Sequence, residues 1–276
     1  MKDIQTRTIT GIIFLITVIG SILLHPLAFF ALFSVFTIIG LKEFYNLREI
    51  KSNPKAGILF YLSGFLIYAI IAIAGLGYIQ SKYLLLALLI FFLQIIIELY
   101  RKDEPNWRRL GTVFSAIIFV SIPFGIMTSL FYTPSFFFDT LNYSYQSGTL
   151  IGLFVIMWSN DVFAYLVGSK FGKHKLFERH SPKKSWEGSI GGFIFAMLAA
   201  YILSLFYPHL SVIEWITMGV IIAISGTFGD LAESLLKRNA GVKDSGTIFP
   251  GHGGVLDRFD AVLFASPFVF VYLNLI

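Results

Sequence analysis

Apolar runs separated by short polar segments occupy most of the chain. A helix of about 20 apolar residues is long enough to cross the hydrocarbon core of a membrane. Runs that approach or reach this length lie at residues 9–24, 27–46, 57–79, 83–99, 111–131, 149–168, 188–206, 212–229 and 260–275. The pattern therefore predicts an all-α integral membrane protein with about nine transmembrane helices.

Two prolines modify this pattern. A proline lacks the backbone N–H that a helix interior needs, and its ring clashes with the preceding turn. Pro26 separates the first two runs, where it predicts a tight turn within a helical hairpin. Pro123 falls inside the fifth run, where it predicts a kink.

Positively charged residues favour one set of loops. If the chain has nine spans, the N-terminus and every second loop contain all of the 21 lysines and arginines except Lys82. Cytoplasmic loops are enriched in these residues. The distribution predicts a cytoplasmic N-terminus and a C-terminus outside, and it accounts for the net charge of +5 without a nucleic-acid partner.

The composition excludes several classes of protein and site. Apolar residues make up 56% of the chain and charged residues 13%, whereas a soluble domain carries about 25% charged residues. Because the chain has no cysteine, disulfides, thiolate metal sites and cysteine nucleophiles are excluded. Any chemistry must come from the polar residues in and between the apolar runs.

The longest strongly charged segment, residues 229–260, lies between the last two apolar runs. On a helix, Asp230, Glu233 and Lys237 would share one face, because they are three and four positions apart. Asp257 would begin the final helix on the same side of the membrane. Carboxylates bind hard cations, and basic side chains bind phosphates. The segment therefore predicts a metal-assisted phosphate site, and the alternative is an ordinary charged loop in water.

A glycine-rich turn lies within this segment, where His252 is surrounded by glycines in the sequence PGHGG, residues 250–254. Such a turn lets the backbone approach a ligand closely. The basic residues around the turn are candidates for binding phosphate groups. They are Lys237, Arg238, Lys243 and Arg258.

A second polar segment extends over residues 158–192. Asp161 lies in an apolar run, where an ionisable side chain indicates either a functional site or a buried group satisfied by neighbouring helices. Lys183, Lys184 and Ser185 are expected in a short loop before the next helix, whose first N–H groups favour an anion. The alternative for these lysines is the ordinary positive charge of a cytoplasmic loop.

Other charged residues have structural interpretations. Glu98 ends the fourth apolar run and is expected to emerge into water. Lys42 and Glu43, near a helix end, are expected to extend towards the membrane surface. His25 and His209 fall in outer loops and are not expected to bind a metal.

The C-terminal half of the chain resembles the phosphatidate cytidylyltransferase family. The resemblance rests on SLLKRNAGVKDSGTIFPGHGGVLDRFD, residues 234–260, and on the upstream patterns NDVFAYLVG, FGKHKL and SPKKSWEGSIGG. The family commonly has threonine at the position of Ser185, which is a conservative difference. The N-terminal helices are similar to the family only in their apolar character.

The resemblance implies a reaction in which phosphatidic acid and CTP give CDP-diacylglycerol and pyrophosphate. It implies Mg²⁺, or a dinuclear centre that also contains K⁺, with Asp230 and Asp257 as the principal ligands and Glu233 as a third. Catalytic roles are implied for Lys237, Arg258 and His252. Contacts with CTP or the lipid phosphate are implied for Asp161, Lys183, Lys184, Ser185, Arg238 and Lys243.

The resemblance also implies an organisation for the whole chain. Residues 1–140, with the first five helices, would form a scaffold and the contacts of a homodimer, and residues 141–276 would form the catalytic region. The protein would lie in a bacterial cytoplasmic membrane with its site facing the cytoplasm. Its partners would be the lipid bilayer, CTP and phosphatidic acid.

Two other functions compete with this one. A CTP-dependent lipid kinase, such as a polyprenol kinase, would transfer the γ-phosphate instead, but the sequence between Lys243 and Asp260 disfavours it. A transporter or scramblase would use Asp161 and Asp230 to line an ion path. It would need charges on both faces of the membrane, whereas nearly all of the basic residues are expected on one face.

Overall fold

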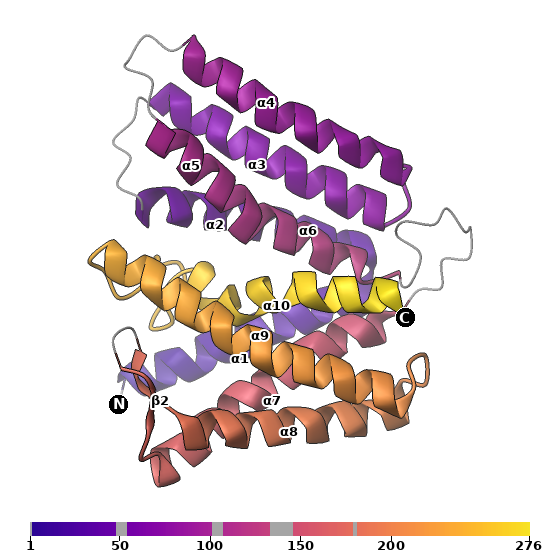
Figure 1. Cartoon of the computed structure of the whole chain (residues 1–276), viewed down its shortest axis with the longest axis vertical. Helices are drawn as coiled ribbons and strands as arrows, with labels where there is room; N and C mark the ends of the chain where they lie inside the picture. Colours follow the sequence, from indigo (N-terminus) through magenta and orange to yellow (C-terminus); the bar gives the residue numbers. More distant parts are fainter. Residues whose placement is uncertain (1, 48–53, 101–106, 133–145, 179–180) are drawn as a thin grey trace. The chain divides into compact units, whose positions relative to one another are not determined.

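A computed structural model describes residues 2–47, 54–100, 107–132, 146–178 and 181–276 (Figure 1). The chain forms two compact units. The N-terminal unit comprises Met1–Tyr145 and Asp244–Asp257, and the C-terminal unit comprises Gln146–Lys243 and Arg258–Ile276. Each unit has its own internal packing.

The N-terminal unit is helical and has an aromatic core. In chain order it contains α1 (Lys2–Leu24), α2 (Pro26–Leu47), α3 (Pro54–Gly75), a 3₁₀ turn (Ser81–Leu85), α4 (Leu86–Leu99), α5 (Trp107–Ala116), a π-helical turn (Ile117–Ser121) and α6 (Ile122–Ser129). Helices α2, α3 and α6 contact one another (Figure 1). Phe33 of α2 meets Phe124 of α6 edge to face, with ring centroids 5.2 Å apart. This geometry is favourable for buried aromatic rings.

Both prolines interrupt the helices of this unit. His25 alone separates α1 from α2, and its Nδ1 accepts the N–H of Leu27 at 3.1 Å, so the tight turn at Pro26 is confirmed. Pro123 lies in the first turn of α6, directly after the π-helical turn. The widened turn makes room for a proline ring that would otherwise clash with the carbonyl four residues earlier.

The expectation that Glu98 simply emerges into water is wrong. Its side chain is buried, and its Oε1 accepts hydrogen bonds from Nη2 of Arg109 at 2.6 Å and from Nε at 3.0 Å. This two-nitrogen contact joins α4 to α5. A planar guanidinium suits such a contact, and a buried carboxylate needs one.

The C-terminal unit contains four helices and one hairpin. They are α7 (Ser147–Phe171), β1 (Lys175–Phe177), β2 (Ser181–Ser185), α8 (Trp186–Phe206), α9 (Val212–Asn239) and α10 (Leu256–Leu275), whose first two residues group with the N-terminal unit. Helices α7, α8 and α9 pack together (Figure 1). A side chain at Gly188 would collide with the backbone of α7 at Ala164 and Gly168. This glycine therefore allows the two helices to approach closely.

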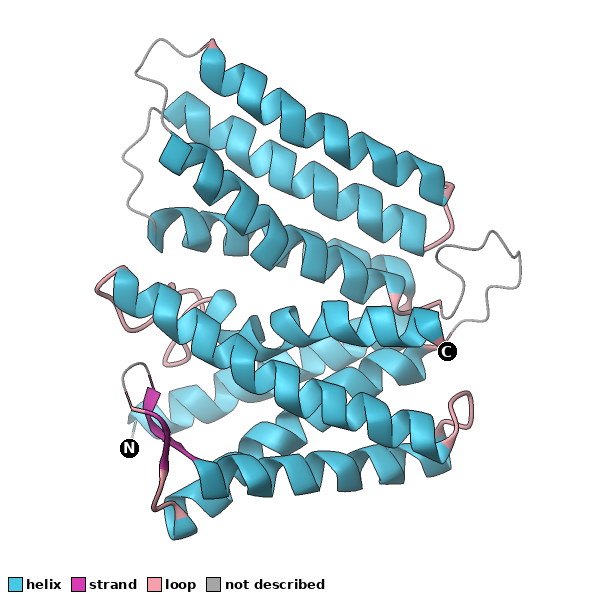
Figure 2. Ribbon diagram, viewed as in Figure 1, coloured by secondary structure: helices cyan, strands magenta, loops and turns pink. Residues whose placement is uncertain are grey.

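The hairpin differs from the expected loop. Residues 181–185 form strand β2, which pairs antiparallel with β1, and Lys175 lies opposite Ser185 (Figure 2). Pairing satisfies the backbone groups of a segment that the sequence only marked as polar. The hairpin is a small addition to an otherwise all-α architecture.

Helix α9 extends beyond the predicted span. It begins with a capping box, in which the Ser211 hydroxyl accepts the N–H of Glu214 and the Glu214 carboxylate accepts the N–H of Ser211. The apolar run predicted a helix ending near residue 229, whereas α9 continues to Asn239. Lys237 and Arg238 occupy its last turn, where cations favour the helix dipole.

Every apolar run predicted to span a membrane falls on a helix. Across the described parts of the chain, seven helices are long and apolar enough to cross a membrane: Pro26–Leu47, Ile58–Gly75, Ser81–Leu99, Trp107–Ser129, Ser147–Phe171, Trp186–Phe206 and Val212–Asn239. Thr8–Leu24 is apolar but shorter, and α10 is helical. The protein is therefore an all-α integral membrane protein, while the count of nine spans and the orientation stay predictions.

Candidate functional site

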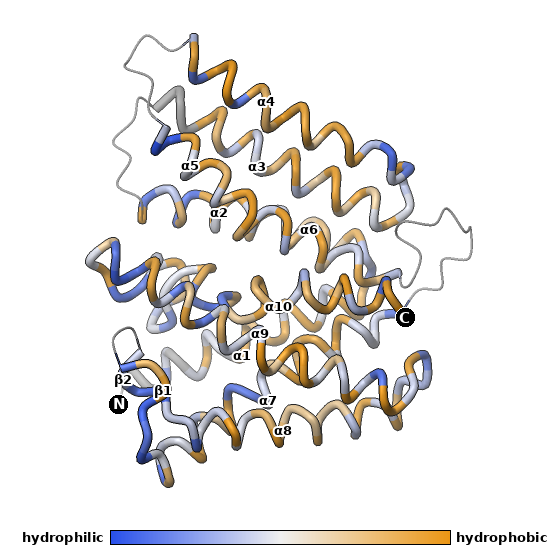
Figure 3. The backbone as a smooth tube through the Cα atoms, viewed as in Figure 1, coloured by the Kyte–Doolittle hydropathy of each residue, from blue (hydrophilic) through white to orange (hydrophobic). Residues whose placement is uncertain are grey.

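The C-terminal unit joins its hairpin to α9 through an ion pair. Nζ of Lys184 on β2 contacts Oδ2 of Asp230 on α9. Both side chains are partly exposed, at 27% for Lys184 and 35% for Asp230. Two of the residues predicted to form a phosphate site are therefore side by side, and their charges remain within reach of a ligand. Figure 3 shows hydrophilic residues at the hairpin and near the C-terminal end of α9.

Ser185 and Glu187 hold the hairpin against the start of α8. The Ser185 hydroxyl accepts the N–H of Gly188 at 3.2 Å and caps the helix. The Glu187 carboxylate accepts the N–H of Lys173 at 3.1 Å and of His174 at 3.2 Å. It also contacts Nδ1 of His174 at 2.6 Å. Ser185 thus has a structural contact in addition to its predicted contact with substrate.

A second lysine–carboxylate pair lies one turn farther along α9. Glu233 is 5% exposed, and its Oε2 contacts Nζ of Lys237. The two residues are four positions apart on the helix. The predicted shared face of Asp230, Glu233 and Lys237 is therefore confirmed as helical.

Further charges of this unit surround Asp230. Asp161 of α7 is close enough to interact electrostatically with Asp230, Lys184 and Arg258. Asp260 of α10 interacts in the same way with Asp230, Asp161 and Lys237. Asp161 is thus part of this charged cluster, although an apolar run contains it. The Asn160 amide donates to its carboxylate at 3.3 Å.

The remaining basic candidates are exposed. Arg238 donates to the carbonyl of Val242 at 3.3 Å, beside the C-terminal end of α9. Lys183, Lys243 and Arg258 are also exposed to solvent. Exposed cations are available to a phosphate group at little desolvation cost.

In the N-terminal unit, Asp257 is held by the segment that precedes it. Asp257 is 9% exposed, and its Oδ2 accepts the N–H of Ser245 at 2.7 Å, the hydroxyl of Ser245 at 2.8 Å and the N–H of Gly254 at 2.8 Å. Three donors to one oxygen stabilise the ionised carboxylate and fix its orientation.

Glu43 of α2 is a residue of this site that the sequence analysis misassigned. Its side chain does not extend towards the membrane surface: the residue is 6% exposed. Its carboxylate accepts the N–H of Val255 at 2.9 Å, the N–H of Leu256 at 2.9 Å and the hydroxyl of Ser245 at 3.1 Å. The only sequence signal was a carboxylate at the end of an apolar run, which does not identify a partner so far along the chain.

The turn around His252 has the predicted glycine geometry. Gly251 and Gly253 have φ values of 75° and 83°, a conformation that favours glycine. The N–H of His252 donates to the carbonyl of Phe249 at 2.8 Å, and the N–H of Phe249 donates to the carbonyl of Gly253 at 2.9 Å. The His252 ring lies beside Gly11 of α1.

The predicted metal ligands have suitable chemistry but lie in different units. Asp230 and Glu233 belong to the C-terminal unit, and Asp257 belongs to the N-terminal unit. Among the described residues, no group of three or more histidine, aspartate or glutamate side chains is placed to hold an ion. Carboxylate oxygens are the ligands that Mg²⁺ prefers. The donor set therefore fits a magnesium ion, and the shared site stays a prediction.

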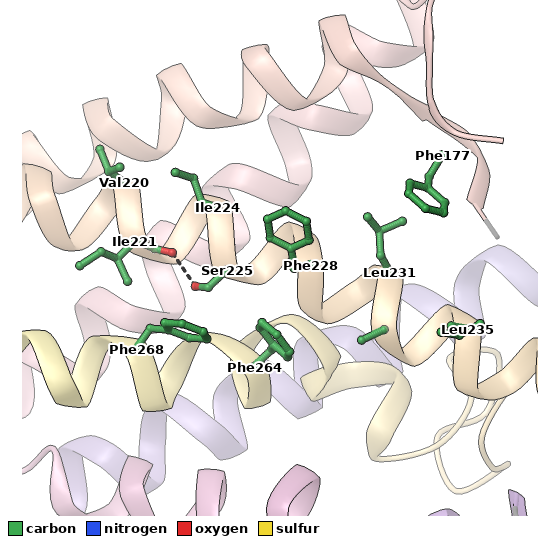
Figure 4. A pocket seen from close by; sticks show the side chains of 11 residues that line it. Phe177, Val220, Ile221, Ile224, Ser225, Phe228, Leu231, Leu235, Phe264 and Phe268 are labelled. Carbon is green, nitrogen blue, oxygen red and sulfur yellow. Dashed lines mark hydrogen bonds between the residues drawn. The ribbon is translucent and has the colours of Figure 1, made fainter. Parts of the chain in front are cut away.

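An apolar groove runs along α9 beside these charges, with a volume of about 800 Å³ (Figure 4). It is lined by Phe177 of β1, by α9 residues between Val220 and Leu235, and by Phe264 and Phe268 of α10. The hydroxyl of Ser225 donates to the carbonyl of Ile221, so the helix itself satisfies this polar group. The groove suits an aliphatic chain.

The sequence matches the family model described as "Cytidylyltransferase family" over residues 5–276. It is 32% identical over 271 residues to a phosphatidate cytidylyltransferase of Staphylococcus aureus (strain COL), covering 98% of both chains. It is 30% identical over 282 residues to a phosphatidate cytidylyltransferase of Bacillus subtilis (strain 168), covering 100% of this chain and 99% of the relative. The similarity therefore includes the N-terminal helices as well as the charged segments.

Proposed function

The chain belongs to the cytidylyltransferase family, and from this premise we propose that it is a phosphatidate cytidylyltransferase. In this reaction, a phosphate oxygen of phosphatidic acid attacks the α-phosphorus of CTP. The bond from that phosphorus to the β-phosphate bridging oxygen breaks, and pyrophosphate leaves. The products are CDP-diacylglycerol and pyrophosphate. Near-full-length similarity to two relatives with this name supports the proposal.

The observation that carries the proposal is that two carboxylates of α9 are paired with lysines, Asp230 with Lys184 of β2 and Glu233 with Lys237 of α9. Nucleotidyl transfer needs positioning and neutralisation of phosphate charge more than covalent catalysis. Lys184 and Lys237 could exchange their carboxylates for phosphate oxygens, because a lysine ammonium sits on a flexible four-carbon stem and donates in several directions. The carboxylates would then be available to a cation that accompanies the nucleotide.

Asp230 and Asp257 would hold Mg²⁺, with Glu233 as a third ligand and K⁺ as a candidate for a second cation. When bound, the metal would supply positive charge beside the phosphate oxygens. The backbone donors around Asp257 would keep its carboxylate ionised and oriented for this role.

Basic residues of the site would bind the phosphate groups of CTP and of phosphatidic acid. We assign phosphate contacts to Lys183, Lys184, Ser185, Arg238, Lys243 and Arg258, with Asp161 near them. The Ser185 hydroxyl accepts a helix N–H and can still donate its proton to an anion. The turn around His252 would close the site, because its glycines let the backbone approach a ligand.

The lipid substrate fits the setting of this site. An acyl chain would lie in the apolar groove, while the phosphate would meet the charged residues of the same helix. Basic loops on one side of the membrane would place the site in the cytoplasm, in a bacterial cytoplasmic membrane. The protein would act as a homodimer with residues 1–140 as its scaffold.

The test uses purified protein in detergent with phosphatidic acid, Mg²⁺ and CTP labelled at the α-phosphate. The expected product is a labelled CDP-lipid together with pyrophosphate. CTP labelled at the γ-phosphate distinguishes the lipid kinase, because only that enzyme would transfer this label to lipid. If CTP stays intact while lipid or ion flux occurs in vesicles, the proposal fails and the transporter reading replaces it.

A further inference from the structure

Glu43 contacts the glycine-rich segment from a distant helix. It lies near the end of α2, and its carboxylate accepts hydrogen bonds from Ser245, Val255 and Leu256, which are 202, 212 and 213 positions away. Leu256 is the first residue of α10. Glu43 thus binds N–H groups at the start of a helix, where the helix dipole favours a negative charge.

The backbone of this segment is shaped around the Glu43 carboxylate. A side chain at Gly246 or at Gly254 would collide with its oxygens. The segment therefore packs closely against the carboxylate at Gly246 and Gly254 and also donates hydrogen bonds to it. The backbone at Gly246 and from Gly254 to Leu256 is thereby held against Glu43.

Glu43 and Asp257 converge on one hydroxyl, whose single proton the two carboxylates must share. The Ser245 Oγ lies 3.1 Å from Oε2 of Glu43 and 2.8 Å from Oδ2 of Asp257. Two buried carboxylates at such close range repel each other, unless donors compensate them. The backbone N–H groups of Ser245, Gly254, Val255 and Leu256 provide that compensation. Moving one carboxylate must therefore disturb the donors of the other.

We propose that Glu43 is a positioning residue, because it orients Asp257 and the segment 244–256 through Ser245 and the N–H groups of Val255 and Leu256. This proposal rests on the proposed function for the role of Asp257. Without the Glu43 carboxylate, two buried N–H groups lose their acceptor, and the segment rearranges to find others. Asp257 then loses the fixed orientation that catalysis needs.

The experiment compares Glu43→Gln, Glu43→Asp and Ser245→Ala with wild type in detergent. The control is Glu178→Gln, because Glu178 is an exposed glutamate of the hairpin turn. Hydrogen exchange of the backbone amides of residues 244–256 reports the segment without any turnover. Steady-state kinetics of CDP-lipid formation separate kcat from KM for both substrates.

For Glu43→Gln, we expect amide exchange in residues 244–256 to rise about 10-fold or more, as loss of a buried acceptor predicts. We expect kcat to fall about 10- to 100-fold, as for groups that orient a ligand, while both KM values change little. Glu43→Asp should recover part of kcat. Combining Glu43→Gln with Ser245→Ala should cost less than the sum of the single effects, because the two act through one contact.

Unchanged exchange in residues 244–256 in both Glu43→Gln and Ser245→Ala would overturn the proposal, and so would strictly additive kinetic losses. If Glu43→Gln does not fold, Glu43→Asp and Ser245→Ala decide the outcome by the same two measurements. If wild type forms no CDP-lipid, the proposed function fails. The exchange measurement then still tests whether Glu43 orders the segment.

Discussion

The two units hold their carboxylates in different ways. In the N-terminal unit, Glu43 and Asp257 are bound by backbone N–H groups and by one hydroxyl. In the C-terminal unit, Asp230 and Glu233 are bound by the flexible ammonium groups of lysines. Backbone donors are fixed by the fold, whereas a lysine side chain has a flexible four-carbon stem and can change partner. The first arrangement fixes a carboxylate, and the second keeps one available for exchange.

Under the proposed function, the two kinds of carboxylate would have different roles. A rigid carboxylate defines where a cation or phosphate sits, at no cost of reorganisation during the reaction. A lysine-paired carboxylate is neutralised while the site is empty, and it becomes a ligand when substrate phosphates attract the lysine.

The largest loss of activity is expected when either of two aspartates, one from each unit, is replaced. Asp257→Asn and Asp230→Asn should each lower kcat about 100- to 1000-fold, because each removes charge stabilisation in the reaction. Only Asp257→Asn should also raise hydrogen exchange in residues 244–256, since a neutral amide accepts these hydrogen bonds less strongly. Kinetics and exchange mass spectrometry on the same samples provide the measurement. Equal exchange in both variants would remove the distinction between the units.

A smaller effect is expected for neighbouring lysines of the hairpin. Lys184→Gln should lower kcat/KM about 10- to 100-fold, because it removes a charged partner of Asp230 and of the substrate. Lys183→Gln should cost less, since Lys183 is exposed. The comparison uses initial rates at low and saturating CTP. Similar losses in both variants would show that the ion pair with Asp230 has no special role.

A substitution that fills the apolar groove should change the affinity for the lipid substrate and leave that for CTP unchanged. Ala232→Phe places a ring in the groove and should raise the KM for long-chain phosphatidic acid about 3- to 10-fold, as burial of one or two fewer methylene groups predicts. A short-chain phosphatidic acid and CTP are the controls, and their KM values should stay near those of wild type. If the KM changes equally for long-chain and short-chain phosphatidic acid, the groove does not bind the acyl chain.

The smallest effect concerns His209, at the opposite end of α9 from the charged pairs. Its Nε2 contacts Oγ1 of Thr149 at 3.0 Å, and its ring lies 5.4 Å from that of Trp215. Burial lowers the pKa of His209 below its ordinary value. The unfolded chain therefore binds the proton more readily, so this contribution to stability is present above the ordinary histidine pKa and is lost as the pH falls through it.

Lowering the pH from 7.5 to 5.5 should therefore reduce the Tm of wild type more than that of His209→Gln. We expect a difference of at most about 2 °C, because one partly buried histidine contributes on the order of 1 kcal/mol or less. Thermal unfolding in detergent, followed at several pH values, measures it. An equal pH dependence in both proteins would assign the effect to other groups.

Local features of the sequence were sufficient to predict the helices. The apolar runs, Pro26 and the spacing of Asp230, Glu233 and Lys237 each act within a few residues, and the structure confirms them. The same logic failed where the backbone found a partner elsewhere. Residues 181–185 form a strand because they pair with β1.

The sequence by itself determined that the chain is an apolar helical protein and which residues could carry its chemistry. Only the tertiary structure decided how each charge is satisfied: Glu98 by Arg109, Asp230 by Lys184, and Glu43 by a segment about 200 positions away. Helix formation depends on hydrogen bonds and side chains within one or two turns, so hydrophobic periodicity reveals it. A buried carboxylate must find donors wherever the fold brings them, and no local pattern records which distant backbone will provide them.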